Sequence, residues 1–174
     1  KTMKGIDRPA ICSFLPTLRG ESVMLDLGAN VECDQENLVQ FAIMGAAFAR
    51  TILGLPRPTV GLLNVGEEEM KGNEAVKGAA AILSQADLPL RFHGFIEGDD
   101  IAKGTTDIVV TDGFTGNVAL KTVEGTAKLF SEFLRTAFSQ SALSKLGYLL
   151  AKPAMKALRD RIDAVLALSA PLAG

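Results

Sequence analysis

The chain has 174 residues, of which 48% are apolar and 22% charged, a balance typical of an ordinary soluble globular domain. Its 20 acidic and 18 basic residues give a formal charge of −2, so the composition does not favour nucleic acid as a partner. No apolar run reaches the roughly 18 residues of a transmembrane helix, and the first residues lack a signal-peptide pattern. We therefore expect a cytoplasmic protein.

Four short segments rich in Val, Ile, Leu and Phe predict strands, at residues 22–27, 59–65, 91–96 and 107–111. Longer stretches between and after them have helical composition, at residues 36–53, 74–85 and 117–138. Asp34 is placed to cap the first helix, and the Gly- and Pro-containing residues 54–58 are placed to end it. This alternation predicts an α/β fold, a three-layer sandwich with a largely parallel sheet.

The two cysteines, Cys12 and Cys33, have neither the spacing of a disulfide framework nor that of a zinc site. We expect both to be small buried residues. The sequence predicts no bound metal and no cofactor.

Each predicted strand is followed by a polar loop that contains glycine, at residues 26–30, 64–69, 97–100 and 112–117. Ligands of open α/β sheets bind beyond the carboxyl ends of the strands, so these loops are the candidate site. Any strand-to-helix turn can use Gly, Asn and Asp for its own geometry, which is the alternative explanation. Four such loops on one edge favour a site.

The last of these loops carries the strongest signal, because it leads from a strand into the start of a helix. Gly113 and Gly116 would let the backbone approach a ligand, and free N–H groups at a helix start favour an anion. Thr115 and Asn117 can add side-chain donors, and Lys121 a positive charge. The spacing matches neither an ATP P-loop nor a dinucleotide fingerprint, so a single anion such as inorganic phosphate fits best.

Two further residues stand in or beside these loops. Lys71 follows the second predicted strand and could reach an acyl or phosphate oxygen, although the acidic run before it could simply stabilise the next helix start. His93, the one histidine, lies within an apolar strand, where a histidine is usually structural. It is a candidate only as a proton donor.

Three segments together resemble the PlsX family, the bacterial phosphate acyltransferases of phospholipid synthesis: residues 64–73 (NVGEEEMKGN), 94–101 (GFIEGDDI) and 112–122 (DGFTGNVALKT). Residues 5–10 (GIDRPA) and 25–30 (LDLGAN) extend the match. The resemblance implies a homodimeric enzyme that moves a long-chain acyl group from acyl carrier protein to inorganic phosphate. It implies a fold similar to isocitrate and isopropylmalate dehydrogenases and phosphotransacetylases. It also implies that this chain is part of a longer one.

In the implied reaction phosphate itself attacks the thioester, so the protein must position an anion and stabilise developing charge. We expect the loop with Thr115, Gly116 and Asn117 to hold phosphate, and Lys71 or Lys121 to pair with its charge. Candidate oxyanion donors are Asn30 and Asn64, and His93 would protonate the leaving thiolate. The alternatives are a short-chain acyl-CoA:phosphate acyltransferase similar to phosphotransacetylase, and a membrane or carrier-protein binding module without catalysis.

The charge is uneven: residues 1–138 carry −5 and residues 139–174 carry +3. We divide the chain there, into an α/β core and a basic amphipathic helical segment attached to the same domain. At helical spacing one stripe of this segment is basic, with Lys145, Lys152, Lys156 and Arg159. The other side is apolar, with Leu143, Leu146, Leu150, Ala154, Ala157 and Leu158.

Pro153 predicts that the segment splits into two short helices. The segment could contact an anionic membrane surface, the acidic carrier protein or a dimer mate. The first choice predicts peripheral association with the inner face of the membrane.

Overall fold

A computed structural model describes residues 6–167 of the chain, without the side chains of Ala164 and Leu166. The chain forms two compact units, Lys1–Ala119 and Leu120–Gly174, which we call the first and the second unit. The division expected at residue 138 stays a prediction, and residues 168–174 of the predicted basic segment lie outside the described residues.

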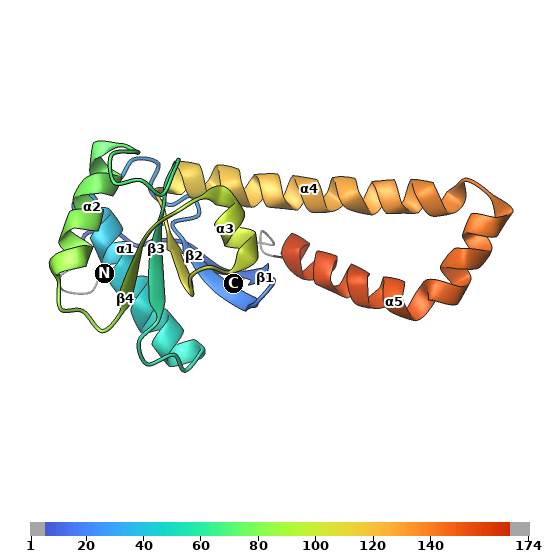
Figure 1. Cartoon of the computed structure of the whole chain (residues 1–174), viewed down its shortest axis with the longest axis horizontal. Helices are drawn as coiled ribbons and strands as arrows, with labels where there is room; N and C mark the ends of the chain where they lie inside the picture. Colours follow the sequence, from blue (N-terminus) through green and yellow to red (C-terminus); the bar gives the residue numbers. More distant parts are fainter. Residues whose placement is uncertain (1–5, 168–174) are drawn as a thin grey trace. The chain divides into compact units, whose positions relative to one another are not determined.

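A five-stranded sheet runs through the described part of the first unit (Figure 1). The strands are β1 (Cys12–Thr17), β2 (Gly20–Leu25), β3 (Thr59–Leu63), β4 (Arg91–Ile96) and β5 (Ile108–Val110). Their order is β1-β2-β5-β3-β4, in which β2, β5, β3 and β4 are parallel and β1 is antiparallel to β2. The predicted largely parallel sheet is therefore confirmed.

Strand β1 was not predicted, and it lies at the edge of the sheet, where a proline such as Pro16 is tolerated. Cys12 at its start is exposed and Cys33 is half-buried, so the expectation of two buried cysteines is wrong. An edge strand leaves part of its surface open to solvent, which explains the exposure of Cys12.

The helices of the first unit follow the strands. Helix α1 (Gln35–Ile52) begins after Asp34, whose side chain accepts a hydrogen bond of 2.8 Å from the N–H of Asn37. Helix α2 (Glu74–Gln85) begins after Asn73, which caps the N–H of Val76 in the same way. Both helices were predicted. A third, α3 (Gly98–Lys103), occupies the predicted loop at residues 97–100, so that part of the prediction is wrong.

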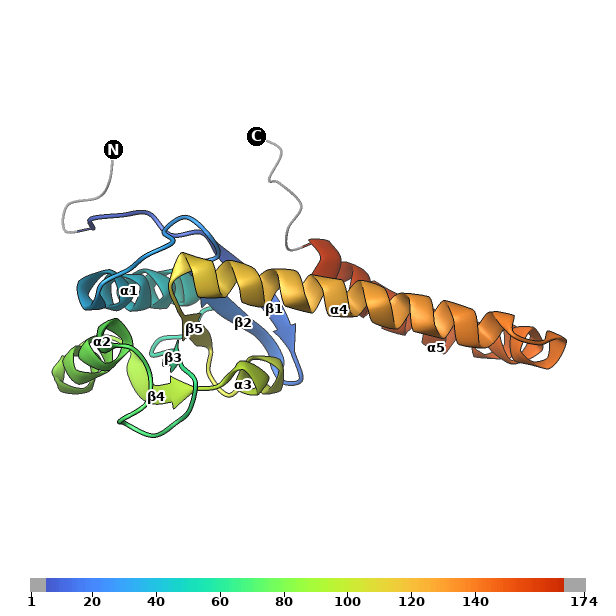
Figure 2. The same ribbon diagram turned by 90° about the horizontal axis from the view of Figure 1, so that it is seen from above.

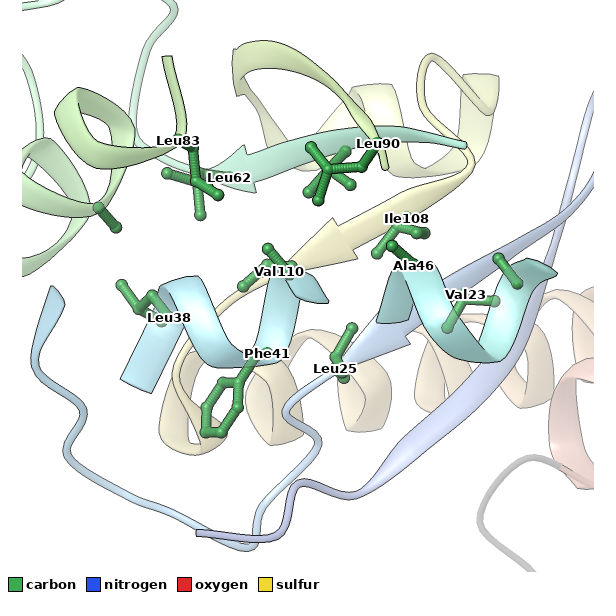
Figure 3. Packing of buried hydrophobic residues seen from close by; sticks show 14 of the residues in the cluster. Val23, Leu25, Leu38, Phe41, Ala46, Leu62, Leu83, Leu90, Ile108 and Val110 are labelled. Carbon is green, nitrogen blue, oxygen red and sulfur yellow. The ribbon is translucent and has the colours of Figure 1, made fainter. Parts of the chain in front are cut away.

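One apolar core lies between the sheet and helices α1 and α2, which pack against each other (Figure 2). Figure 3 shows side chains of the core, among them Val23, Leu25, Leu38, Phe41, Leu62, Ile108 and Val110. Met24 and Val109 point to the opposite face of the sheet and are also fully buried. Both faces are therefore covered, as the sequence predicted from strands that are apolar throughout.

The described part of the second unit is helical. Helix α4 (Gly113–Ser139) starts in the first unit and continues into the second, and α5 (Ala142–Leu166) follows it. The rings of Phe138 and Tyr148 lie 5.3 Å apart and join the two helices. Pro153 lies inside α5, so the prediction of two separate short helices is wrong, although α5 changes direction part-way along (Figure 1). No helix among the described residues is both long and apolar enough to span a bilayer.

Candidate functional site

Four strands end at one edge of the first unit's sheet. Because β2, β5, β3 and β4 are mutually parallel, the residues that follow them meet at their shared carboxyl edge. The predicted site loops at residues 26–30, 64–69 and 112–117 all begin there, as does α3. The structure thus gathers the candidate loops at the edge where α/β proteins bind ligands.

Asp26, which was not among the predicted site residues, organises the first of these loops. Its carboxylate is completely buried, and Oδ1 accepts hydrogen bonds from the N–H groups of Ile11, Gly28 and Ala29 at 3.0–3.1 Å. Its Oδ2 accepts two more, both 2.7 Å long, from the backbone N–H and the side-chain Nδ2 of Asn30. An acidic residue directly after an apolar strand was the available signal for this role.

Asn30 is tied into the same loop. Besides its bond to Asp26, its Nδ2 donates to the carbonyl of Pro9 at 2.8 Å. Both amide hydrogens of Asn30 therefore have partners within the protein. Its backbone carbonyl accepts a 2.7 Å hydrogen bond from the N–H of Gly113, the first residue of α4.

Two glycines let the first turn of α4 pack directly on this loop. A Cβ on Gly113 would lie 2.5 Å from the carbonyl oxygen of Asn30, and a Cβ on Gly116 would collide with the carbonyl oxygen of Asp26. The prediction of a loop at residues 112–117 is wrong from Gly113 onward, where the helix begins. The glycines allow a close approach, but the chain they approach is another loop of the protein.

Asp112 caps the start of α4. Its carboxylate accepts hydrogen bonds from the N–H of Thr115 at 2.8 Å and from the Thr115 hydroxyl at 2.7 Å. Asn117 is exposed, and its Cγ would lie 3.6 Å from a Cβ on Gly28. The hydroxyl of Thr115 therefore already donates its proton to Asp112. The side-chain amide of Asn117, in contrast, is exposed to solvent and lies over the loop that follows Asp26.

The side chain of Asn64 holds the loop between β3 and α2 in shape. Asn64 donates from Nδ2 to the carbonyls of Gly66 and Lys71, each at 3.1 Å. Gly72 packs against the Asn64 side chain with a φ of 94°, a conformation suited to glycine. The amide hydrogens of Asn64, like those of Asn30, are committed to shaping a loop.

Lys71 lies in this loop. Its ammonium lies 2.9 Å from the Glu68 carboxylate, and half of its side chain is exposed. The hydrogen bond that Lys71 donates to the Glu68 carboxylate raises the pKa of Lys71 and lowers the pKa of Glu68. Lys71 therefore stays cationic, and the carboxylate beside it occupies the kind of position an anionic ligand would take.

His93 lies apart from these loops. The register between β3 and β4 shifts so that Phe92 pairs with Val60 and Gly94 pairs with Gly61, which leaves His93 as the extra residue of a bulge. It is exposed on an edge strand, three residues and about 10 Å before the end of β4. The structure does not bring it beside the loops at the carboxyl edge.

The remaining predicted residues belong to the second unit. Lys121 pairs with Glu124 at 3.1 Å. On α5, Leu143, Leu146 and Leu150 are 78%, 52% and 78% exposed, although they are apolar. The basic residues Lys145, Lys152, Lys156 and Arg159 are exposed as well, and Lys145 and Arg159 also line a hollow between α4 and α5.

Leu158 was predicted on the same side as the exposed leucines, but it lines the hollow between α4 and α5. The apolar residues of α5 thus form two faces. Among the described residues, no group of three His, Cys, Asp or Glu side chains could hold a metal ion.

Comparison with known proteins agrees with this architecture. The structure is similar to the EutD phosphotransacetylase from Staphylococcus aureus, with a TM-score of 0.58 and 19% identity over 73% of this chain and 44% of that chain. This likeness supports the predicted phosphotransacetylase-like fold and, at such low identity, speaks for the fold alone.

Curated phosphate acyltransferases are much more similar to this chain in sequence. The chain is 65% identical to a phosphate acyltransferase of Rhodospirillum centenum and 62% identical to one of Rhodospirillum rubrum, in both cases over 94% of this chain. It spans about half the length of these curated relatives, 46% and 47%. The family model described as fatty acid synthesis protein matches residues 1–174. The chain therefore belongs to the fatty acid synthesis protein family, the PlsX family that the sequence motifs indicated.

Proposed function

We propose that the protein transfers a long-chain acyl group from acyl carrier protein to inorganic phosphate, producing an acyl phosphate for phospholipid synthesis. Relatives more than 60% identical carry the name phosphate acyltransferase. The observation that carries the proposal to this chain is the packing of the Asp26 loop on the first turn of α4, beside which Asn117 is exposed. No nucleophilic side chain is required, because phosphate is the nucleophile.

In the proposed reaction a phosphate oxygen attacks the thioester carbonyl carbon, and the carbon–sulfur bond then breaks to release the carrier thiolate. The exposed amide of Asn117 donates to phosphate, and Lys71 exchanges its Glu68 partner for phosphate. Gly113 and Gly116 contribute by holding α4 against the loop rather than by contacting the anion. His93 lies about 10 Å before the end of β4, so it has no part in the proposed reaction, and the carrier leaves as the thiolate.

Asn30 and Asn64 have a different role in this proposal from the one expected from sequence. Each amide already donates to two oxygen atoms of the protein. An oxyanion donor must have a hydrogen free to point at the developing charge. We therefore propose that both residues shape the loops and that the oxyanion is stabilised by Lys71.

The acyl donor decides between this function and its alternatives. Full-length protein is incubated with phosphate and either a long-chain acyl carrier protein or acetyl-CoA, and acyl phosphate is trapped with hydroxylamine as the hydroxamate. Product from the carrier thioester supports the proposal. Product from acetyl-CoA alone supports a phosphotransacetylase-like enzyme, and binding without product supports a non-catalytic module.

Two variants connect the product to the site. Asn117→Ala and Lys71→Ala remove the proposed phosphate contacts and should each lower kcat/KM for phosphate by about tenfold or more. Lys128→Ala removes an exposed lysine of α4 and is the matched control. Unchanged phosphate kinetics in both site variants would contradict the assignment of these residues.

We further propose that α5 contacts an anionic membrane surface, which would place the protein peripherally on the inner face of the membrane. The exposed face with Leu143, Leu146 and Leu150 supports this, since apolar side chains beside exposed lysines are typical of helices that lie in a membrane interface. The basic residues Lys145, Lys152, Lys156 and Arg159 would add attraction to anionic lipid or to the acidic carrier protein. We also propose that the protein forms a homodimer, as the family resemblance implies.

Vesicle co-sedimentation tests this contact. Wild-type protein should bind vesicles that contain anionic lipid, and Leu146→Glu with Leu150→Glu should abolish most of that binding. Thr136→Glu, which adds a negative charge to the exposed part of α4 without removing a leucine, should retain it. Equal binding by all three proteins rules out the leucine face as the lipid contact, and sedimentation velocity then reports whether that face joins two copies.

A further inference from the structure

The buried carboxylate of Asp26 connects more of the candidate site than any other side chain described above. In the described residues it accepts five hydrogen bonds, from Ile11 before β1 and from three consecutive residues of the loop after β2, with Asn30 donating twice. Its backbone N–H also donates to the carbonyl of Thr111 at the end of β5, at 3.0 Å. Asp26 thus joins the ends of β2 and β5 to the loop that packs against α4.

We infer that Asp26 is a positioning residue for phosphate: it holds the loop at residues 28–30 in the one arrangement that lets α4 place Asn117 at the carboxyl edge of the sheet. This inference rests on the proposed function. It concerns a residue that contacts neither phosphate nor the acyl group in the proposed reaction and acts through its neighbours.

The path from Asp26 to Asn117 is short and consists of backbone contacts. Asn30 belongs to the loop that the Asp26 carboxylate fixes. Its backbone carbonyl accepts a 2.7 Å hydrogen bond from the N–H of Gly113. The carbonyl of Asp26 itself lies where a Cβ on Gly116 would be. Asn117 is the next residue along α4, and its side chain lies over Gly28 of the same loop. A shift of the loop therefore shifts the first turn of α4.

Charge and geometry explain why a carboxylate is needed. All five partners of Asp26 are N–H donors, and a carboxylate can accept from all of them, whereas an amide can accept at one end only. In Asp26→Asn the new NH₂ group would face donors of its own kind, either the two from Asn30 or the three from the other residues. The buried N–H groups left without an acceptor would draw the loop out of place.

The test compares phosphate use with acyl-donor use in full-length Asp26→Asn. We expect the KM for phosphate to rise by about tenfold, as the loss of bonds to a charged group predicts, while the KM for the acyl donor changes less than about twofold. Ser22→Ala is the matched control, because it removes another buried hydrogen bond of β2, from Ser22 Oγ to the carbonyl of Thr106 at 2.8 Å. It should lower the melting temperature without changing the KM for phosphate.

A milder variant covers the case in which Asp26→Asn does not fold. Asn30→Ala deletes the Nδ2 donor and leaves Asp26 four backbone partners, so we expect a smaller rise in the KM for phosphate. If either folded variant keeps the wild-type KM for phosphate, or if Ser22→Ala raises it equally, the inference is overturned.

A wild-type protein that forms no acyl phosphate would refute the proposed function instead. The inference is then read from phosphate-dependent melting: phosphate should raise the melting temperature of the wild type and have less effect on Asp26→Asn. Equal increases in the two proteins overturn the inference in that case.

Discussion

The backbone N–H of Gly113 donates a hydrogen bond of 2.7 Å to the carbonyl of Asn30. This bond ties the first residue of α4 to the loop after β2, although the two residues lie far apart in the sequence. A helix start normally leaves its first N–H groups free for a ligand, solvent or a cap. Here the Gly113 N–H serves to join two motifs of the candidate site.

Gly116→Ala should separate these motifs. The added methyl group would collide with the carbonyl oxygen of Asp26, which is backbone and cannot rotate away. We expect a loss of about 1–3 kcal/mol in the free energy of unfolding and a fall of tenfold or more in phosphate acyltransferase activity. Urea unfolding and the hydroxamate assay measure the two effects.

Gly125→Ala is the matched control in the same helix, since nothing lies within 4 Å of a Cβ at that position. Alanine is a better helix former than glycine by about 1 kcal/mol, so this variant should be as stable as the wild type or more so. Similar losses in both glycine variants would show that the close contact at Gly116 is not the cause.

Asn64→Ala should loosen the loop that carries Lys71. It removes two hydrogen bonds, to the carbonyls of Gly66 and Lys71, and leaves both carbonyls without that donor. We expect the KM for phosphate to rise about three- to tenfold with little change in melting temperature, because the loop is largely exposed. A fall in kcat at constant KM would instead favour the oxyanion role that the sequence suggested.

Glu68→Gln should strengthen phosphate binding. The Glu68 carboxylate pairs with Lys71 at 2.9 Å and would compete with phosphate for the same ammonium. We expect the KM for phosphate to fall about two- to threefold, because an ion pair between exposed side chains is weak and offers little competition. Glu67→Gln removes a neighbouring exposed charge and should have a smaller effect.

The same variant has a signature in its pH dependence. Glu68 raises the pKa of Lys71, so the lysine keeps its proton to a higher pH than usual. Without Glu68 that pKa falls back, and the alkaline limb of phosphate binding should move to lower pH. An alkaline limb at the same pH in both proteins would mean that Lys71 does not hold the anion.

Asp100 should make the first unit sensitive to acid. Its pKa is lowered mainly by the hydrogen bond from the N–H of Glu97, at 3.0 Å, and also by Lys103. Stability from a carboxyl with a lowered pKa is fully present above its ordinary pKa of about 4 and is lost as the pH falls through the lowered value. Asp100→Asn should therefore cost about 1–2 kcal/mol near pH 7 and less near pH 2.

Urea unfolding at several pH values measures this difference. Asp99→Asn is the control, because Asp99 is mostly exposed and its ion pair with Lys103 should contribute little. A constant difference between wild type and Asp100→Asn from pH 7 to pH 2 would contradict the predicted linkage.

Much of the fold followed from local patterns. Strand β4 and helix α2 have the predicted bounds, because an apolar run between polar turns marks the first and Asn73 marks the start of the second. Strand β1 and helix α3 were missed. Each has only six residues, and β1 contains Pro16 while α3 begins with a glycine, so neither carries a strong periodic pattern.

The start of α4 shows where local patterns stop being sufficient. Glycines at 113 and 116 are unfavourable for a helix, so the sequence favoured a loop. The helix nevertheless begins at Gly113, because Asp112 caps it and only glycine fits against the backbone of Asn30 and Asp26. Packing against a distant loop outweighed the local propensity.

By itself the sequence determined the α/β class, the parallel sheet and the edge at which the polar loops gather, because periodicity and loop composition are local properties. It also carried the family motifs. Only the tertiary structure decided which polar groups remain available to a ligand. The side-chain amides of Asn30 and Asn64 donate their hydrogens to carbonyl and carboxylate oxygens that folding brings close, whereas Asn117 is exposed. A hydrogen bond depends on the distance between two atoms, and that distance is set by the packing of the whole unit.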